Sequence, residues 1–105
     1  MSLGSEKELN YLLRYFTVTD SDYLVKTKQL RYLAHSKNRK AINLILDYYN
    51  SVPDVTKERI ITEHLSKCIL ELPKDATTGK YDVKTVDKWL KKHRKNYKIN
   101  VNSIQ

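Results

Sequence analysis

The chain is poor in residues that interrupt a fold or cross-link it. It has two glycines and two prolines among 105 residues, and so few turn formers argue against a sandwich or barrel of short strands. Cys68 is the single cysteine, which excludes an intrachain disulfide and favours a reducing, intracellular setting. No apolar run approaches the roughly 18 residues that span a bilayer, so we expect no membrane-spanning helix.

The sequence also lacks the motifs on which many enzymes depend. With Gly4 and Gly79 as its only glycines, it cannot form a glycine-rich phosphate loop. It contains no His-Glu-x-x-His and no Cys-x-x-Cys pattern. His64 and Cys68 lie four residues apart and would present two metal ligands on one helical face, but a structural zinc site needs four. We therefore expect a protein that is not an enzyme and holds no metal or cofactor, with His64 and Cys68 in the core.

What the sequence does contain is helical periodicity. Hydrophobic residues make up 40% of the chain, enough for one modest core in a domain of this length. Their spacing predicts five helices, over about residues 6–16, 23–35, 37–51, 56–72 and 83–98. This predicts an all-α fold, a compact bundle of about five helices with orthogonal or helical-repeat-like packing.

Local signals set the expected boundaries. The segment 37–51 is apolar nearly all round, which is typical of the central helix of a bundle, and Ser36 is a candidate for its N-cap. Asp82 is placed to cap the last helix. We expect one helical domain over residues 6–99, an expression-tag remnant at 1–5 and a flexible tail at 100–105.

Positive charge is abundant and unevenly distributed. Lys and Arg number 20 against 12 Asp and Glu, a net charge of +8. Residues 23–46 carry six bases and no acid, and residues 83–98 carry seven bases and one acid. The segment between them, 47–79, holds six acids and four bases. Such an imbalance indicates an anionic partner: nucleic acid, an acidic or phosphorylated peptide, or a membrane surface.

The last predicted helix, 83–98, is the most informative segment. On a helical wheel its apolar residues share one arc, on which Trp89 and Leu90 dock the helix to the core. The opposite side carries a ridge of five lysines, whose mutual repulsion weakens a helix by a few tenths of a kcal/mol per pair. Binding to phosphates would offset this repulsion, because lysines that neutralise phosphates release counterions. The alternative is a solvated face whose lysines serve solubility.

We therefore predict a non-enzymatic binding module that contacts the backbone of DNA or RNA, chiefly through this helix. The predicted contact residues are the bases of both blocks: Lys84, Lys88, Lys91, Lys92, Arg94, Lys95, Lys98, Lys26, Lys28, Arg31, Lys37, Arg39 and Lys40. Whether the two blocks form one patch depends on the fold. The run 91–95 is similar to a short nuclear-import signal, which favours the nucleus if the source is eukaryotic.

Two rival functions remain. The domain would instead be a protein-interaction module of a larger regulatory protein, holding a partner helix in a groove or an acidic or phosphorylated peptide on its basic face. A membrane-surface role is disfavoured because Trp89 and Leu90 are needed in the core, and we expect no small-molecule substrate. Tyrosines interleaved with the basic blocks, namely Tyr23, Tyr32, Tyr81 and Tyr97, would either stack on unpaired bases or pack at the core edge.

Overall fold

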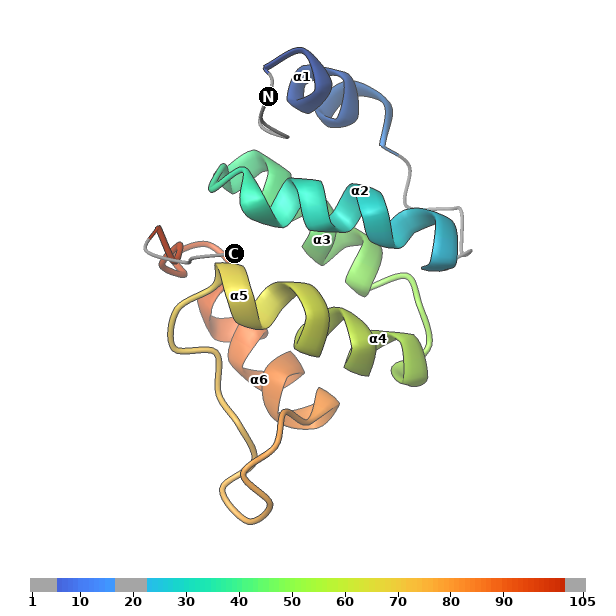
Figure 1. Ribbon diagram of the computed structural model, residues 1–105. Coiled ribbons are helices and arrows are strands. Elements are labelled where there is room, and N and C mark those ends of the chain that lie inside the picture. Colours follow the sequence, from blue (N-terminus) through green and yellow to red (C-terminus); the bar gives the residue numbers. More distant parts are fainter. Residues whose placement is uncertain (1–5, 17–22, 102–105) are drawn as a thin grey trace.

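Figure 1 shows a computed structural model of the chain, which describes residues 6–16 and 23–101. Over these residues the protein is an all-α bundle, as predicted. Its helices are α1 (Glu6–Tyr15), α2 (Tyr23–His35), α3 (Arg39–Tyr49), the continuous run of α4 (Asp54–Ile60), the π-helical turn η1 (Ile61–Leu65) and α5 (Ser66–Cys68), and finally α6 (Val83–His93). The expected tag remnant at 1–5 and the tail residues 102–105 lie outside the described residues.

The helix α3 is the centre of the core. Six of its eleven residues are buried: Ala41, Ile42, Ile45, Leu46, Tyr48 and Tyr49. It packs against α1, α2 and α4, so its nearly all-round apolar sequence is explained by neighbours on several sides. The run 54–68 lies below α2 and α3 in Figure 1, with α6 on its far side.

Side-chain N-caps mark the first residues of α3 and α6. The Ala41 amide donates to the Asn38 side chain at 3.1 Å, so Asn38 is the N-cap of α3. The expectation of Ser36 was wrong, because the Ser36 hydroxyl donates to the Leu33 carbonyl at 2.6 Å instead. Asp82 caps α6 as predicted, accepting from the Thr85 amide at 3.1 Å.

The fourth predicted helix, 56–72, ends four residues earlier than expected. After Cys68 the backbone becomes extended, and Ile69 forms an antiparallel bridge with Ile99. The Leu70 amide donates to the Lys98 carbonyl at 2.9 Å, and the Asn100 amide donates to the Cys68 carbonyl at 2.9 Å. These long-range hydrogen bonds replace those that a longer helix would have made.

The last predicted helix, 83–98, is also too long, since α6 ends at His93 and a turn follows at 94–96. Tyr97 then leaves the helical path and packs against α3, where its hydroxyl donates to the Asn43 side chain at 2.9 Å. Asn100, expected to begin a flexible tail, is instead fixed to Cys68. Hydrophobic spacing identified most of the buried positions of both segments, although Trp89, expected in the core with Leu90, is only half-buried against it. Tertiary contacts ended the helices.

Candidate nucleic-acid interface

The helix α6 separates an apolar face from a basic one. Val83, Val86 and Leu90 are buried against the core. The lysines of the helix are all exposed, and none of the described carboxylates pairs with them: Lys84, Lys88, Lys91 and Lys92. Of the five lysines expected on the ridge, Lys84, Lys88 and Lys91 lie on α6, and Lys92 lies on the same helix beside them. Lys95 and Lys98 are exposed too, but they lie beyond the end of the helix.

The segment that follows α6 is held against the start of α3. Arg39 lies over the Tyr97 ring, with its guanidinium carbon 4.4 Å from the ring centroid, and donates to the Tyr97 carbonyl at 2.8 Å. Arg94 reaches α3 from the other side, donating to Asp47 at 2.6 Å. The block at 83–98 therefore meets the C-terminal part of the block at 23–46, at the start of α3.

Several bases gather around this junction, which we call the basic end. Lys37 lies close enough to Cys68 to act electrostatically on its thiol, and the Asn100 side chain donates to the Lys67 carbonyl at 3.5 Å. The basic end comprises Lys37, Arg39, Lys40, Lys67, Lys95 and Lys98. Figure 1 shows its three contributing segments side by side: the α2–α3 junction, the end of α5 and the C-terminal segment.

Three of the predicted contact residues are already engaged in the fold: Arg39 with Tyr97, as described above, and also Lys26 and Arg94. Lys26 is only 4% exposed, with its amine 4.3 Å from the centroid of the Phe16 ring, so its assignment to the interface was wrong. Arg94 is half-buried and paired with Asp47, which reduces its availability for phosphates. Lys28 and Arg31 are exposed on α2, which Figure 1 shows on the other side of the run 54–68 from α6.

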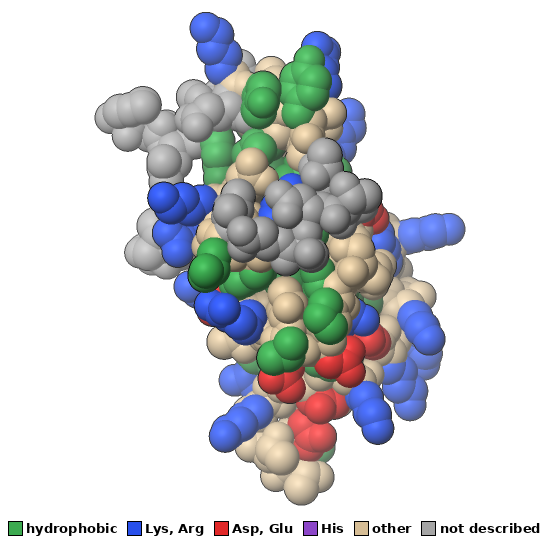
Figure 2. Space-filling model, turned by 90° about the vertical axis from the view of Figure 1, so that its right-hand side faces the viewer, with side chains coloured by type: hydrophobic (Ala, Val, Ile, Leu, Met, Phe, Trp, Pro, Cys, Tyr) green, Lys and Arg blue, Asp and Glu red, His purple; other side chains and the backbone are tan. Residues whose placement is uncertain are grey.

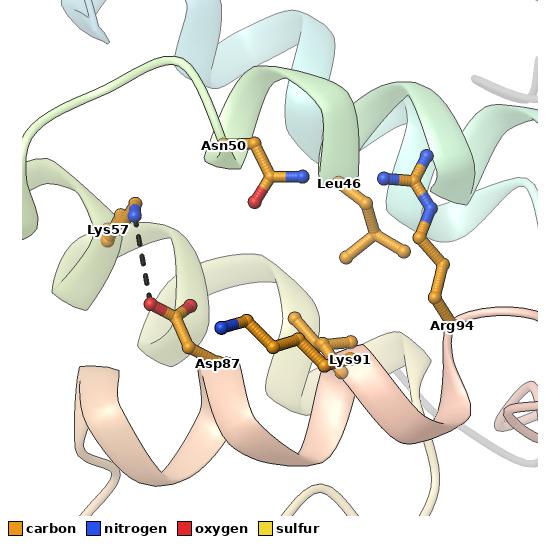
Figure 3. A pocket seen from close by; sticks show the side chains of 7 residues that line it. Leu46, Asn50, Lys57, Asp87, Lys91 and Arg94 are labelled. Carbon is orange, nitrogen blue, oxygen red and sulfur yellow. Dashed lines mark ion pairs between the residues drawn. The ribbon is translucent and has the colours of Figure 1, made fainter.

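A groove opens between α3, α4 and α6, with a volume of about 400 Å³. Leu46 and Leu90 provide apolar lining, and its polar lining is Asn50, Lys57, Asp87, Lys91 and Arg94. Figure 3 shows the Lys91 amine extending into this groove beside Asp87. The groove, which includes Lys91, is thus of mixed charge, unlike the outer side of α6, which carries Lys84, Lys88 and Lys92.

Asp87 is occupied by two partners on the wall of the groove. The Tyr49 hydroxyl donates to it at 2.7 Å, and the Lys57 amine lies 3.8 Å from its other oxygen. Burial and this carboxylate together raise the pKa of Tyr49 well above its usual value. Asp54 and Asp82 lie near the same hydroxyl, and Figure 2 shows acidic side chains gathered low on one face. Acidic residues therefore cluster at the N-terminal ends of α4 and α6.

His64 and Cys68, the pair considered as metal ligands, are buried, as expected. Burial raises the pKa of the Cys68 thiol to about 12, which leaves it unreactive at neutral pH. His64 is 2% exposed, and its Nε2 lies 3.1 Å from the Tyr23 hydroxyl. Burial lowers the pKa of His64 to about 4. Among the described residues there is no group of three or more His, Cys, Asp or Glu side chains suited to a metal ion.

The tyrosines beside the basic blocks pack against the core and are not free to stack on bases. Tyr23, Tyr32 and Tyr97 are buried and Tyr81 is half-buried, so the packing alternative was right for most of them. The exposed tyrosines are Tyr11 and Tyr15 on α1, outside both basic blocks. Sequence reasoning missed them because it looked for aromatic residues only beside lysines.

Comparison with family models, with curated proteins and with solved structures finds no match for this chain. None of the helices in the described parts of the chain is long and apolar enough to cross a bilayer. The arrangement of charge on the bundle therefore carries the functional inference.

Proposed function

We propose that this protein binds the phosphate backbone of nucleic acids on a surface formed by the outer side of α6 and the basic end. The supporting observation is the set of exposed lysines on α6 and in the following segment that have no carboxylate partner among the described side chains. Each amine that replaces a condensed counterion on a phosphate favours binding through release of that counterion. Backbone contacts of this kind carry no sequence information.

The separation of charge strengthens the proposal. The carboxylates nearest to α6 are turned toward the core side: Asp82 caps the helix and Asp87 bonds to Tyr49 and Lys57. Neither pairs with the lysines of the outer side, so an approaching polyanion meets a field of one sign there. The acids clustered at the starts of α4 and α6 repel the same polyanion, so the protein would bind it with these acids turned away from it.

The experiment is an anisotropy titration of labelled single-stranded DNA, single-stranded RNA, duplex DNA and heparin at several salt concentrations. The test variant is Lys88→Glu/Lys92→Glu on α6. The control is Lys74→Glu/Lys80→Glu, which makes the same change of charge at two exposed lysines in the loop before α6. We expect steep salt dependence for the wild type and the control.

For the α6 variant we expect at least a tenfold loss of affinity and a plot of log K against log salt that is shallower by about 1.5, since each lost phosphate contact removes about 0.7–0.9. Equal losses of affinity in the α6 variant and the control would mean that binding depends only on net charge and not on the surface of α6. Failure of the wild type to bind any nucleic acid at about 50 mM salt, where such contacts are strong, would end the proposal.

A second function is favoured by the groove between α3, α4 and α6. Its apolar lining, Leu46 and Leu90, and its mixed polar rim suit an amphipathic segment of a protein partner. Such binding buries apolar surface and survives high salt. A partner complex that persists at about 1 M salt, where the Debye length is near 3 Å, would favour this function over the first.

A further inference from the structure

The helix α1 presents an aromatic pair to the outside. Tyr11 and Tyr15 are 61% and 56% exposed, and their ring centroids lie 4.9 Å apart. The opposite side of the same helix already supplies the core contact through buried Leu12. Neither tyrosine ring is needed to fill the core, and a large exposed aromatic surface of this kind is typical of a binding site.

A pocket of about 270 Å³ lies between α1 and α2 beside Tyr11. Its lining is Tyr11, Leu12, Lys28, Gln29 and Tyr32. None of the side chains that the structure describes in this lining is a carboxylate, and Lys28 is exposed. The pocket therefore combines two aromatic rings with a positive charge.

The pocket also has a buried acceptor in need of a donor. The Gln29 side-chain oxygen is buried and receives no hydrogen bond within the described part of the chain. A buried acceptor without a donor costs about 1–3 kcal/mol. Because this oxygen is closed to solvent, the Gln29 side chain has to turn toward the pocket before an N–H group of a ligand can satisfy it. The lining thus suits a ligand with three features: a flat ring beside the tyrosines, an N–H group for Gln29 and a negative charge for Lys28.

We infer that this pocket binds an unpaired nucleobase, with the adjoining phosphate at Lys28. The inference rests on the proposed function and narrows its ligand to single strands or to unpaired bases in loops. Bases within a duplex are already stacked and paired, so they do not enter such a pocket. Base–tyrosine stacking is worth about 1–3 kcal/mol per base and tolerates any sequence.

The test compares Tyr11→Ala with its matched control Tyr11→Phe, which keeps the ring. The probes are labelled 20-residue oligo(U) and oligo(dT) and a DNA duplex of the same length, titrated by anisotropy. We expect Tyr11→Ala to lose about 5-fold to 100-fold in affinity for both single strands while its duplex affinity stays within twofold. Tyr11→Phe should bind as the wild type does.

Because Tyr11 is exposed, the alanine variant should fold, and its circular dichroism spectrum checks this. Wild-type single-strand affinity in a folded Tyr11→Ala overturns the pocket and leaves the proposed function intact, whereas failure of the wild type on all probes overturns both. Photo-cross-linking with oligonucleotides that carry 5-iodouracil gives a second measurement. We expect adducts on Tyr11 or Tyr32, and adducts confined to α6 would contradict the assignment.

Discussion

At the scale of single residues, the structure separates cations that hold the fold from cations that face outward. Lys26 and Lys40 have the same formal charge, yet Lys26 is buried over the Phe16 ring and Lys40 is exposed at the start of α3. The sequence could not make this distinction, since both lie in one block without acids. Side-chain burial depends on the helix that packs alongside, not on neighbours in the chain.

Replacing Lys26 by Met should leave nucleic-acid affinity within twofold of the wild type. Methionine keeps an unbranched apolar stem in the buried site, and the lost charge does not face the solvent. Anisotropy titrations with the same probes measure this. A tenfold loss of affinity in the folded variant would mean that Lys26 contacts nucleic acid after all.

His64 should make stability depend on pH between about 6.5 and 4. The pKa of His64 is lowered to about 4 in the folded protein, whereas an unfolded histidine titrates near 6.5. The unfolded state therefore binds more protons in this range, and the free energy of unfolding falls as the pH falls. A shift of this size corresponds to about 3 kcal/mol across the window.

Urea denaturation of the wild type and of His64→Gln at several pH values tests this expectation. The variant starts from lower stability because it disturbs a buried site, so the informative quantity is the slope against pH. We expect the slope between pH 6.5 and 4.5 to be largely lost in His64→Gln. An unchanged slope would assign the pH dependence to other groups.

At the scale of helices, spacing and capping residues predicted most of the fold. The range of α2 is as predicted, and Asp82 begins α6 where expected. Apart from the N-cap of α3, which is Asn38 rather than Ser36, the failures lie at C-terminal ends, where 56–72 and 83–98 both stop early. Ile69 and Ile99 form an antiparallel bridge instead of continuing these helices. The two residues are far apart in the sequence, so the hydrophobic spacing of neither segment predicts that they pair.

The cap of α6 gives a prediction at this scale. Asp82→Ala should reduce the free energy of unfolding by about 1 kcal/mol, because the Thr85 amide loses its acceptor. Asp82→Ser is the control and should recover most of the loss, since serine caps as well as aspartate. Urea unfolding measures both variants. Equal loss in both would show that the charge matters rather than the cap.

For the whole molecule, the distribution of charge could be anticipated only in part. Two basic blocks were evident in the sequence, and the exposure of most of their lysines follows from their placement opposite the apolar stripe. Their meeting at α3 depends on Arg39 and Tyr97, and the acids around Tyr49 come from two separate segments, the starts of α4 and α6. Contacts of this type follow from the packing of distant segments, so the sequence alone could not predict where the charges lie on the surface.

Lysine acetylation followed by mass spectrometry tests the surface as a unit. Bound nucleic acid should protect Lys40, Lys67, Lys95 and Lys98 of the basic end, together with Lys88 and Lys92 on α6. Lys74 and Lys80, in the loop between α5 and α6, should react at the same rate in free and bound protein. Uniform protection of all these lysines would indicate binding without a preferred orientation.

The contact between Arg39 and Tyr97 joins positions 58 residues apart in the chain. During synthesis, α1 to α4 leave the ribosome well before the segment that completes the basic end. A nascent chain therefore exposes the start of α3 before Tyr97 covers it, and the basic end, on which the proposed phosphate contacts depend, is completed only when this late segment packs.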